Sequence, residues 1–347
     1  MKARTSHATA LRDGYAFPMA LAAIVVISLI IGVAAVQVQR GMESYALQDA
    51  DFDRNVQAIS ADQTFLYHAL TSPMAARGVE IGGLSATDRL IGRTVADPDS
   101  VTLLRANGEP RLYAGNMVVR YLDQQSFFNA AVLGIEGRDA RMTALGIPEI
   151  RQAALGAALA DYQDDDDLRR PGGAERAAYS DPDMPPNRPL ISPLEICQVA
   201  GWAREDICAD PNRLLLLTMN RGTRQINARL AGMPMLRLLT DSVEDAEDAA
   251  EDYRDGFLVD FAGIDWPELD PMTDILSAPT SATGQFAVIV QDRSARHAWI
   301  SVYSLTPESV LAPFSLAYRY RIGGEYVRDV LGMTADESIQ PLPEAGR

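Results

Sequence analysis

The chain has 347 residues, of which 47% are hydrophobic and 22% are charged, a balance typical of a folded protein rather than a disordered one. Its formal net charge is −16, which argues against nucleic-acid binding and against a basic membrane-surface patch. This length accommodates one membrane helix and about two further domains.

The N-terminal region predicts a membrane-spanning helix. Residues Tyr15–Val38 carry no charged side chain. At about 1.5 Å per residue, this segment covers the roughly 30 Å hydrocarbon core of a bilayer. A cleaved signal peptide is the alternative, but its apolar region would be shorter, about 7–15 residues. The preceding segment, residues 1–14, is polar and contains Lys2 and two arginines, so we expect it to stay cytoplasmic while the remainder is exported.

The same helix is predicted to continue beyond the membrane to about Leu70. No proline occurs between Arg40 and Pro73, which is the first residue that requires a helix to end. We expect a bend at Gly41. An apolar stripe with a repeat of seven residues runs along this part: Tyr45, Phe52, Ile59 and Leu66. Val56 and Leu70 fill the alternate row. Such a stripe predicts burial against a globular domain.

Strands are predicted next. Val101–Leu104 and Arg111–Tyr113 flank the dipeptide Asn107-Gly108, a strong hairpin signal. A third strand is expected over Asn116–Leu122, where apolar residues alternate. An antiparallel sheet is therefore predicted to begin near residue 100.

The pattern then changes to helical spacing and later returns to strands. The segments with helical spacing are Phe127–Leu133, Ile147–Tyr162, Pro193–Val199, Arg204–Cys208, Leu230–Leu239 and Val243–Tyr253. The segments that read as closing strands are 284–292, 297–305 and 315–323. Because strands on both sides can share one sheet, we expect an α+β fold with an inserted all-α domain.

Two cysteines and an acidic run are candidate site residues. Cys197 and Cys208 form an even pair in a segment predicted to be exported, which favours a disulfide; two buried free thiols remain the alternative. Asp164, Asp165, Asp166 and Asp167 could supply oxygen ligands to calcium, or they could form a solvated loop. The second acidic stretch, Asp241 to Asp255, reads most simply as a solvated helix face.

No catalytic motif is present in the sequence. His7, His68 and His297 lie far apart, and none occurs in a metal-ligand spacing such as HExxH. A GxSxG elbow, a P-loop and a GxGxxG motif after a strand are also missing from the sequence. We therefore do not expect an enzyme.

Several segments resemble one family. The start of the chain, RDGYAFPMALAAIVV, resembles a type IV prepilin leader. Three later segments follow in order and spacing: ALADYQDDDDLRRPGGAERAAYS, PPNRPLISPLEICQVAGW and LLLLTMNRGTRQINARLA. Together they resemble the K-class minor pseudopilin of the bacterial type II secretion system, over nearly the whole chain. The sequence departs from the family in QQSFFNA and at Asn227, which concerns local loops.

The resemblance implies a pilin-like fold, in which a long N-terminal transmembrane helix packs on an antiparallel sheet, with a large inserted all-α domain. The implied division is a prepilin leader at 1–14, a membrane segment at 15–38, a helix and first strands at 39–125, the inserted domain at 126–275, closing strands at 276–335 and a tail at 336–347. It also implies cleavage after Gly14 and methylation of the new N-terminus, Tyr15. Met19 stands where most pilin-type subunits carry a glutamate. The K class also lacks this glutamate, and it is placed at the pseudopilus tip.

The implied function is a non-enzymatic subunit of the inner membrane, with its C-terminal domain in the periplasm, that supports pseudopilus assembly and export of folded proteins. The implied partners are the minor pseudopilins of the H, I and J classes, the major pseudopilin, prepilin peptidase and the exported substrates. No cofactor is required, and calcium is the candidate ion. A minor pilin of a related type IV system and a membrane-anchored periplasmic hydrolase are the alternatives.

Overall fold

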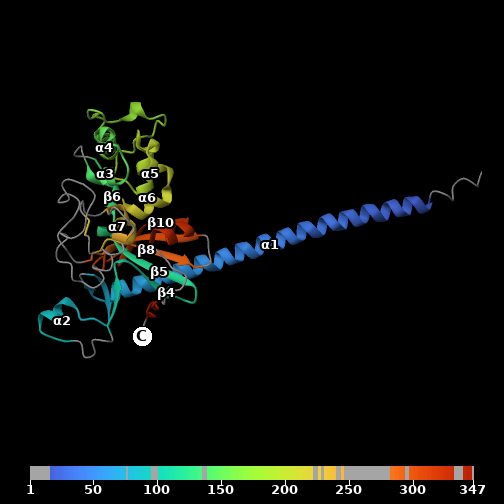
Figure 1. Cartoon of the computed structure of the whole chain (residues 1–347), viewed down its shortest axis with the longest axis horizontal. Coiled ribbons are helices and arrows are strands. Elements are labelled where there is room, and N and C mark those ends of the chain that lie inside the picture. The colour runs from blue at the N-terminus through green and yellow to red at the C-terminus, as the bar shows by residue number, and fades with distance from the viewer. Residues whose placement is uncertain are drawn as a thin grey trace, which may run out of the picture. The chain divides into compact units, whose positions relative to one another are not determined.

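The structure is a computed structural model that describes residues 16–75, 77–94, 101–134, 139–221, 226–227, 230–239, 244–245, 282–293, 297–331 and 339–345 (Figure 1). It contains two compact units, Met1–Val56 and Gln57–Arg347. The predicted processing residues Gly14 and Tyr15, and nearly all of the second acidic stretch, lie outside the described residues.

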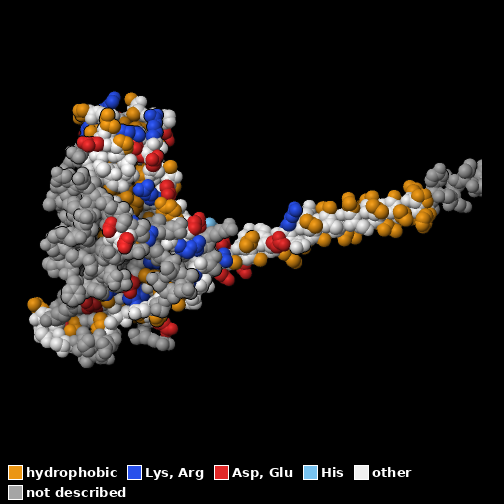
Figure 2. All heavy atoms as spheres, viewed as in Figure 1, with side chains coloured by type: hydrophobic (Ala, Val, Ile, Leu, Met, Phe, Trp, Pro, Cys, Tyr) orange, Lys and Arg blue, Asp and Glu red, His pale blue; other side chains and the backbone are white. Residues whose placement is uncertain are grey.

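Helix α1 runs without interruption from Ala16 to Thr71, in agreement with the predicted end near Leu70. It passes through Gly41, where a bend is predicted, as a continuous helix. Hydrophobic side chains cover its N-terminal part, and charged side chains appear only farther along (Figure 2). Among the described residues, α1 is the one helix that is long and apolar enough to cross a membrane, by length and composition alone.

Five antiparallel strands form the main sheet, in the order β10-β9-β8-β5-β4. Their bounds are β4 Asn107–Tyr113, β5 Met117–Asp123, β8 Gln285–Asp292, β9 His297–Leu305 and β10 Phe314–Gly323. The predicted closing strands are therefore confirmed nearly to the residue. Strands β5 and β8 are neighbours, from Met117 opposite Asp292 to Asp123 opposite Phe286, although residues 124–284 separate them in sequence.

A second sheet corrects the predicted hairpin. Strand β3 (Thr102–Arg105) pairs with β2 (Gly78–Ile81) and not with β4, so Asn107-Gly108 is not a hairpin turn. These two residues lie inside β4 at an irregularity in its pairing with β5. Gly108 has φ of +87°, a conformation that suits a bulge as well as a turn. The dipeptide therefore indicated a positive φ correctly, but the prediction of a hairpin turn at this position was wrong.

Short helices occupy much of the described part of the segment between β5 and β8. They are α3 Ala140–Ala144, α4 Glu149–Gln163, α5 Asp206–Ala209, α6 Pro211–Leu217 and α7 Met233–Leu239, with single 3₁₀ turns η2 Gln124–Ser126, η3 Ala130–Val132, η4 Arg176–Ala178, η5 Pro193–Gln198 and η6 Trp202–Arg204. The predicted helix over Phe127–Leu133 is wrong: β6 (Phe128–Asn129) pairs in parallel with β7 (Thr218–Met219), and η3 follows. The remaining elements are β1 Met74–Ala75, α2 Ala86–Leu90 and α9 Gly324–Leu331.

The face of α1 that packs on the sheet differs from the predicted stripe. Three alanines and two larger apolar residues are buried there, in a core shared with β5, β8 and β9: Ala58, Ala61, Phe65, Leu66 and Ala69. Of the predicted stripe only Leu66 is buried; Tyr45 is 77% exposed, Phe52 64% and Ile59 41%. Alanine has no side chain beyond Cβ, so this face lets the helix lie close to the sheet. The larger residues of the stripe face outward.

Candidate functional site

A cluster of three carboxylates lies at the C-terminal end of α4. Asp161 is in the last turn of the helix, and Asp164 directly follows it. The chain then loops away and returns at Glu175, just before η4. One oxygen from each of these three side chains can be chosen so that all lie within 4.8 Å of one another, the one such group that could hold a metal ion among the described residues.

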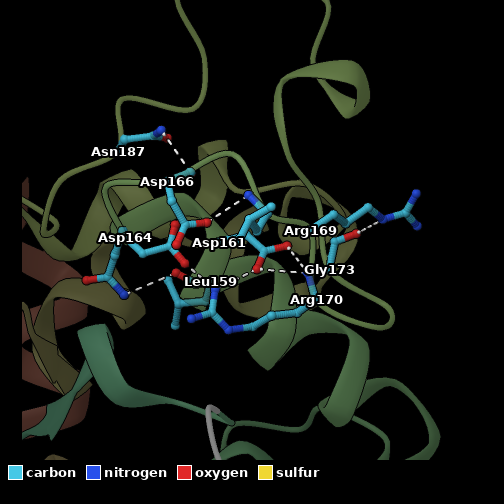
Figure 3. A network of polar contacts seen from close by, with 10 residues as sticks. Leu159, Asp161, Asp164, Asp166, Arg169, Arg170, Gly173 and Asn187 are labelled. Carbon is cyan, nitrogen blue, oxygen red and sulfur yellow. Dashed lines mark hydrogen bonds and ion pairs between the residues drawn. The ribbon is translucent and has the colours of Figure 1, made fainter.

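Arg170 partly neutralises this cluster. Its Nη1 donates to Asp161 Oδ1 at 2.8 Å and also to Asp164 Oδ2, and its backbone N–H donates to Asp161 Oδ2 at 3.2 Å. Figure 3 shows the Arg170 side chain beside both aspartates, with Arg169 turned away to the carbonyl of Gly173. The Arg170 side chain is 45% exposed, so water screens this cation.

Glu175 has no such compensation. The residue is 7% exposed, and both of its carboxylate oxygens are buried without a hydrogen-bond partner. Burial raises the pKa of Glu175 to about 7, and the nearby carboxylates of Asp161 and Asp164 add to this rise. A buried carboxylate without a partner is unfavourable, so an orphaned one beside two others indicates a site for a cation.

The loop between Asp164 and Glu175 is shaped to reach the cluster. Gly173 lies so close to Asp161 that a Cβ added there would overlap the carboxylate oxygen Oδ2. Earlier in the loop, Asp166 accepts a hydrogen bond from the Leu168 N–H at 2.7 Å, and its carbonyl accepts one from Asn187 at 3.2 Å (Figure 3). Both of these hydrogen bonds hold the loop at Asp166.

Only Asp164 of the predicted calcium ligands belongs to the cluster. Asp165, Asp166 and Asp167 are exposed. The two missed residues are Asp161 and Glu175. Asp161 stands three residues before Asp164, a helical spacing that places two side chains together and could have been recognised. Glu175 is brought to the cluster by a loop, and no local sequence pattern predicts that position.

The donor set suits a hard cation. Three carboxylates carry six oxygens, of which both of Asp161 and one of Asp164 also accept hydrogen bonds from Arg170; calcium takes about six to eight oxygen ligands at 2.3–2.6 Å. The two oxygens of Glu175 accept no hydrogen bond from the protein, so they are free to coordinate such an ion. The residues present therefore fit calcium.

The predicted cysteine pair is joined in the structure. Cys197 in η5 and Cys208 in α5 form a disulfide, with their Cα atoms 5.6 Å apart. Between them, the fully buried Trp202 donates its Nε1–H to the carbonyl of Leu155 at 3.0 Å. The disulfide thus closes this irregular segment on itself, and the hydrogen bond of Trp202 attaches the segment to α4.

A second buried network holds the loop after the cluster. Glu195 accepts hydrogen bonds from the Tyr162 hydroxyl at 3.0 Å and from the Ile191 N–H at 2.7 Å, and it forms an ion pair with Arg188 at 2.8 Å. Burial raises the pKa of Glu195, but these donors outweigh burial and hold the pKa below its usual value. Glu195 is therefore satisfied by the protein itself, in contrast to Glu175.

Comparison with known proteins finds a family match in this region. Residues 138–209, roughly a fifth of the chain, match the family model described as type II secretion system (T2SS), protein K. The crystal structure of the GspK-GspI-GspJ complex from enterotoxigenic Escherichia coli type 2 secretion system contains a chain that is 18% identical to this one, with a TM-score of 0.39. The alignment covers 61% of this chain and 83% of that chain.

No curated protein matches this sequence. The family match spans α3, α4, the carboxylate cluster, the disulfide and α5. The resemblance to protein K of the type II secretion system is therefore confirmed, through residues 138–209.

Proposed function

We propose that this protein is the K-class minor pseudopilin of a type II secretion system, a non-enzymatic subunit that supports pseudopilus assembly and protein export. The observation that carries the proposal is the family match over residues 138–209. The apolar N-terminal part of α1 supports it, because it fits a single-pass anchor in the inner membrane. The disulfide between Cys197 and Cys208 agrees with a domain exported to the oxidising periplasm.

The domain division supports a position at the tip. In the proposal, residues 126–275 form a domain inserted into the pilin-like part, which the pairing of β5 with β8 across that segment favours. Such a bulky domain would prevent a further subunit from stacking above it. Met19 agrees with this position, because a subunit with no neighbour above gains nothing from a carboxylate buried in the membrane.

The exposed stripe of α1 is the proposed contact with neighbouring subunits. Tyr45, Phe52 and Ile59 are large apolar residues that the rest of the chain leaves exposed. Exposed apolar surface of this kind marks protein–protein contacts. The partners in this proposal are minor pseudopilins of the H, I and J classes and the major pseudopilin, with the exported proteins as cargo.

The carboxylate cluster is the proposed calcium site of the inserted domain. Asp161, Asp164 and Glu175 would hold the ion, and its charge would neutralise carboxylates that otherwise repel one another. The role is structural: the ion would join the end of α4 to the loop that returns at Glu175. Asp165, Asp166 and Asp167 would contribute only their electrostatic field.

Co-purification tests the assembly role. The full chain, extracted from membranes in detergent with an affinity tag at its C-terminus, is expected to retain the I- and J-class subunits of the same cell. A chain with Phe52 replaced by glutamate is the matched comparison, since Phe52 is exposed and we expect its replacement to leave the fold intact. Recovery of neither subunit with the unaltered chain would contradict the proposal, and recovery of pilus subunits instead would favour a type IV minor pilin.

Mass spectrometry tests the processing step. Prepilin peptidase is expected to cut after Gly14, so that the mature chain begins with N-methylated Tyr15. A mature chain that still carries Met1 would contradict this part of the proposal.

A further inference from the structure

We propose that the seam between the last turns of α1 and strands β9 and β10 is a proton-operated latch, which tightens when Asp62 is protonated and loosens when Asp62 is ionised. The seam consists of Asp62 with its neighbours on α1, Ser301 and Tyr303 on β9, and Arg319 on β10. The inference goes beyond the proposed function and does not depend on it.

The first observation is where the carboxylate lies. Asp62 is 1% exposed, in the middle of the α1 face that packs on the sheet. Its neighbours on that face are Ala58, Ala61, Phe65 and Leu66, all of them buried and apolar. A carboxylic acid in this position is out of reach of water, so only the protein can stabilise its charge.

The second observation is that the protein stabilises that charge incompletely. Asp62 Oδ2 accepts hydrogen bonds from Ser301 Oγ at 2.8 Å and from the Tyr303 hydroxyl at 3.2 Å. Its other oxygen, Oδ1, is buried without a hydrogen-bond partner. The carboxylate is therefore only half satisfied.

The third observation concerns the cation. Arg319 Nη1 is 4.0 Å from Asp62 Oδ2, beyond hydrogen-bond distance, and Arg319 Nε and Nη2 are buried without a hydrogen-bond partner. Arg319 belongs to β10, which lies at one edge of the five-stranded sheet. The groups that act on Asp62 are thus two hydroxyls and one guanidinium, and the guanidinium is too far away to donate a hydrogen bond to it.

The titration has a definite direction. Burial raises the pKa of Asp62 to about 6, although Ser301, Arg319 and Tyr303 lower it. The folded protein therefore holds the proton more tightly than the unfolded chain. The stability that this proton provides is present at low pH and is lost as the pH rises from about 4 to about 6. The seam is expected to be tighter in mild acid than at neutral pH.

Urea unfolding of the full chain in detergent micelles, followed by tryptophan fluorescence, tests the latch. Trp299 on β9 belongs to the core beneath α1 and reports on this seam. With a pKa that moves from 3.8 to about 6 on folding, Asp62 alone should lower the folding constant about tenfold between pH 5 and pH 7.5. Asp62→Asn should remove this tenfold part of the decrease.

Comparison with the unaltered chain at each pH cancels the contributions of other groups, such as Asp123, whose pKa burial also raises to about 6. Asp183→Asn, at an exposed site, is the matched control and should keep the full decrease. An Asp62→Asn protein whose folding constant falls as steeply as that of the unaltered chain would overturn the latch.

Arg319→Met gives an independent readout that does not require Asp62→Asn to fold. Arg319 lowers the pKa of Asp62, so its loss should raise the pKa of that carboxyl further and move the decrease in stability to higher pH. A purely structural role of Arg319 would lower stability equally at every pH. An unmoved midpoint of the pH profile would therefore also overturn the proposal.

Discussion

Replacement of Glu175 by glutamine should have opposite effects without and with calcium. Without calcium, Glu175 is a buried carboxylate beside Asp161 and Asp164, and neither of its oxygens has a partner. Glutamine has nearly the same shape and carries no charge. The variant should therefore be more stable than the unaltered chain at pH 8 in a chelator, and less responsive to calcium.

The magnitude follows from the pKa. A rise from 4.5 to about 7 corresponds to about 3 kcal/mol at 1.36 kcal/mol per pKa unit. Water around the neighbouring exposed aspartates screens this interaction, so we expect about 1–2 kcal/mol. The folded pKa lies above the unfolded one, so this penalty appears as the pH rises from about 4.5 to 7 and is fully present at pH 8. The gain of the variant should disappear at pH 4.

Calcium should reverse the order of stability of the unaltered chain and the Glu175→Gln variant. At a free concentration 100 times its dissociation constant, calcium should stabilise the unaltered chain by about 2.7 kcal/mol. Loss of one charged ligand should weaken binding at least tenfold, which leaves the variant about 1.4 kcal/mol of this stabilisation. Thermal unfolding of the full chain in detergent, in chelator and in calcium, measures both effects.

The matched control is Asp167→Asn, which removes an equal charge from an exposed residue outside the cluster. It should keep the calcium response. Equal calcium responses from Glu175→Gln and the unaltered chain would refute the assignment of the cluster as a metal site.

Three further predictions concern packing, the disulfide and the exposed stripe. Gly156→Ala should lower the free energy of unfolding by about 1–2 kcal/mol in urea titrations, because the added methyl group would overlap the backbone of Gly134 and overpacking outweighs the gain in helix propensity; no loss would mean that the two segments are not in contact. Replacement of both Cys197 and Cys208 by serine should lower it by about 2–3 kcal/mol, since the closed loop is short, and an unchanged urea midpoint would show that the bond does not constrain the unfolded chain. Phe52→Glu should leave the thermal midpoint unchanged and reduce recovery of partner subunits at least tenfold, whereas full recovery would exclude Phe52 from the interface.

The strands were the most predictable part of the fold. Two-residue alternation located β8, β9 and β10 because their apolar residues face buried cores on the sheet. The same reasoning misplaced the hairpin at Asn107-Gly108, since a positive φ at Gly108 serves a bulge inside β4 equally well. A dipeptide reports a backbone conformation, and only the pairing partners reveal where the chain turns.

The long helix shows a different limit. Hydrophobicity located the start of α1 and Pro73 its end, but the apolar residues of the seven-residue repeat were assumed to face the sheet. The sheet instead receives Ala58 and Ala61, because small side chains permit close packing, and Phe52 faces outward. An apolar stripe predicts that something covers it, without saying whether the cover belongs to the same chain.

The candidate metal site was predicted in part. The acidic run drew attention to the right loop, and Asp164 belongs to the cluster. Glu175 could not be found from the sequence, because its place depends on a loop that contains Gly173 and returns to the end of α4. Burial separates the three clustered carboxylates from the exposed aspartates, and burial is a property of the folded loop.

Export by the cell that makes this protein tests the account most directly. Deletion of the gene should leave type II secretion substrates in the periplasm, and the full chain supplied in trans should restore their release to the medium. A Phe52→Glu chain that accumulates normally should fail to restore it. Normal release in the deletion strain would contradict the assignment of this protein to the secretion pseudopilus.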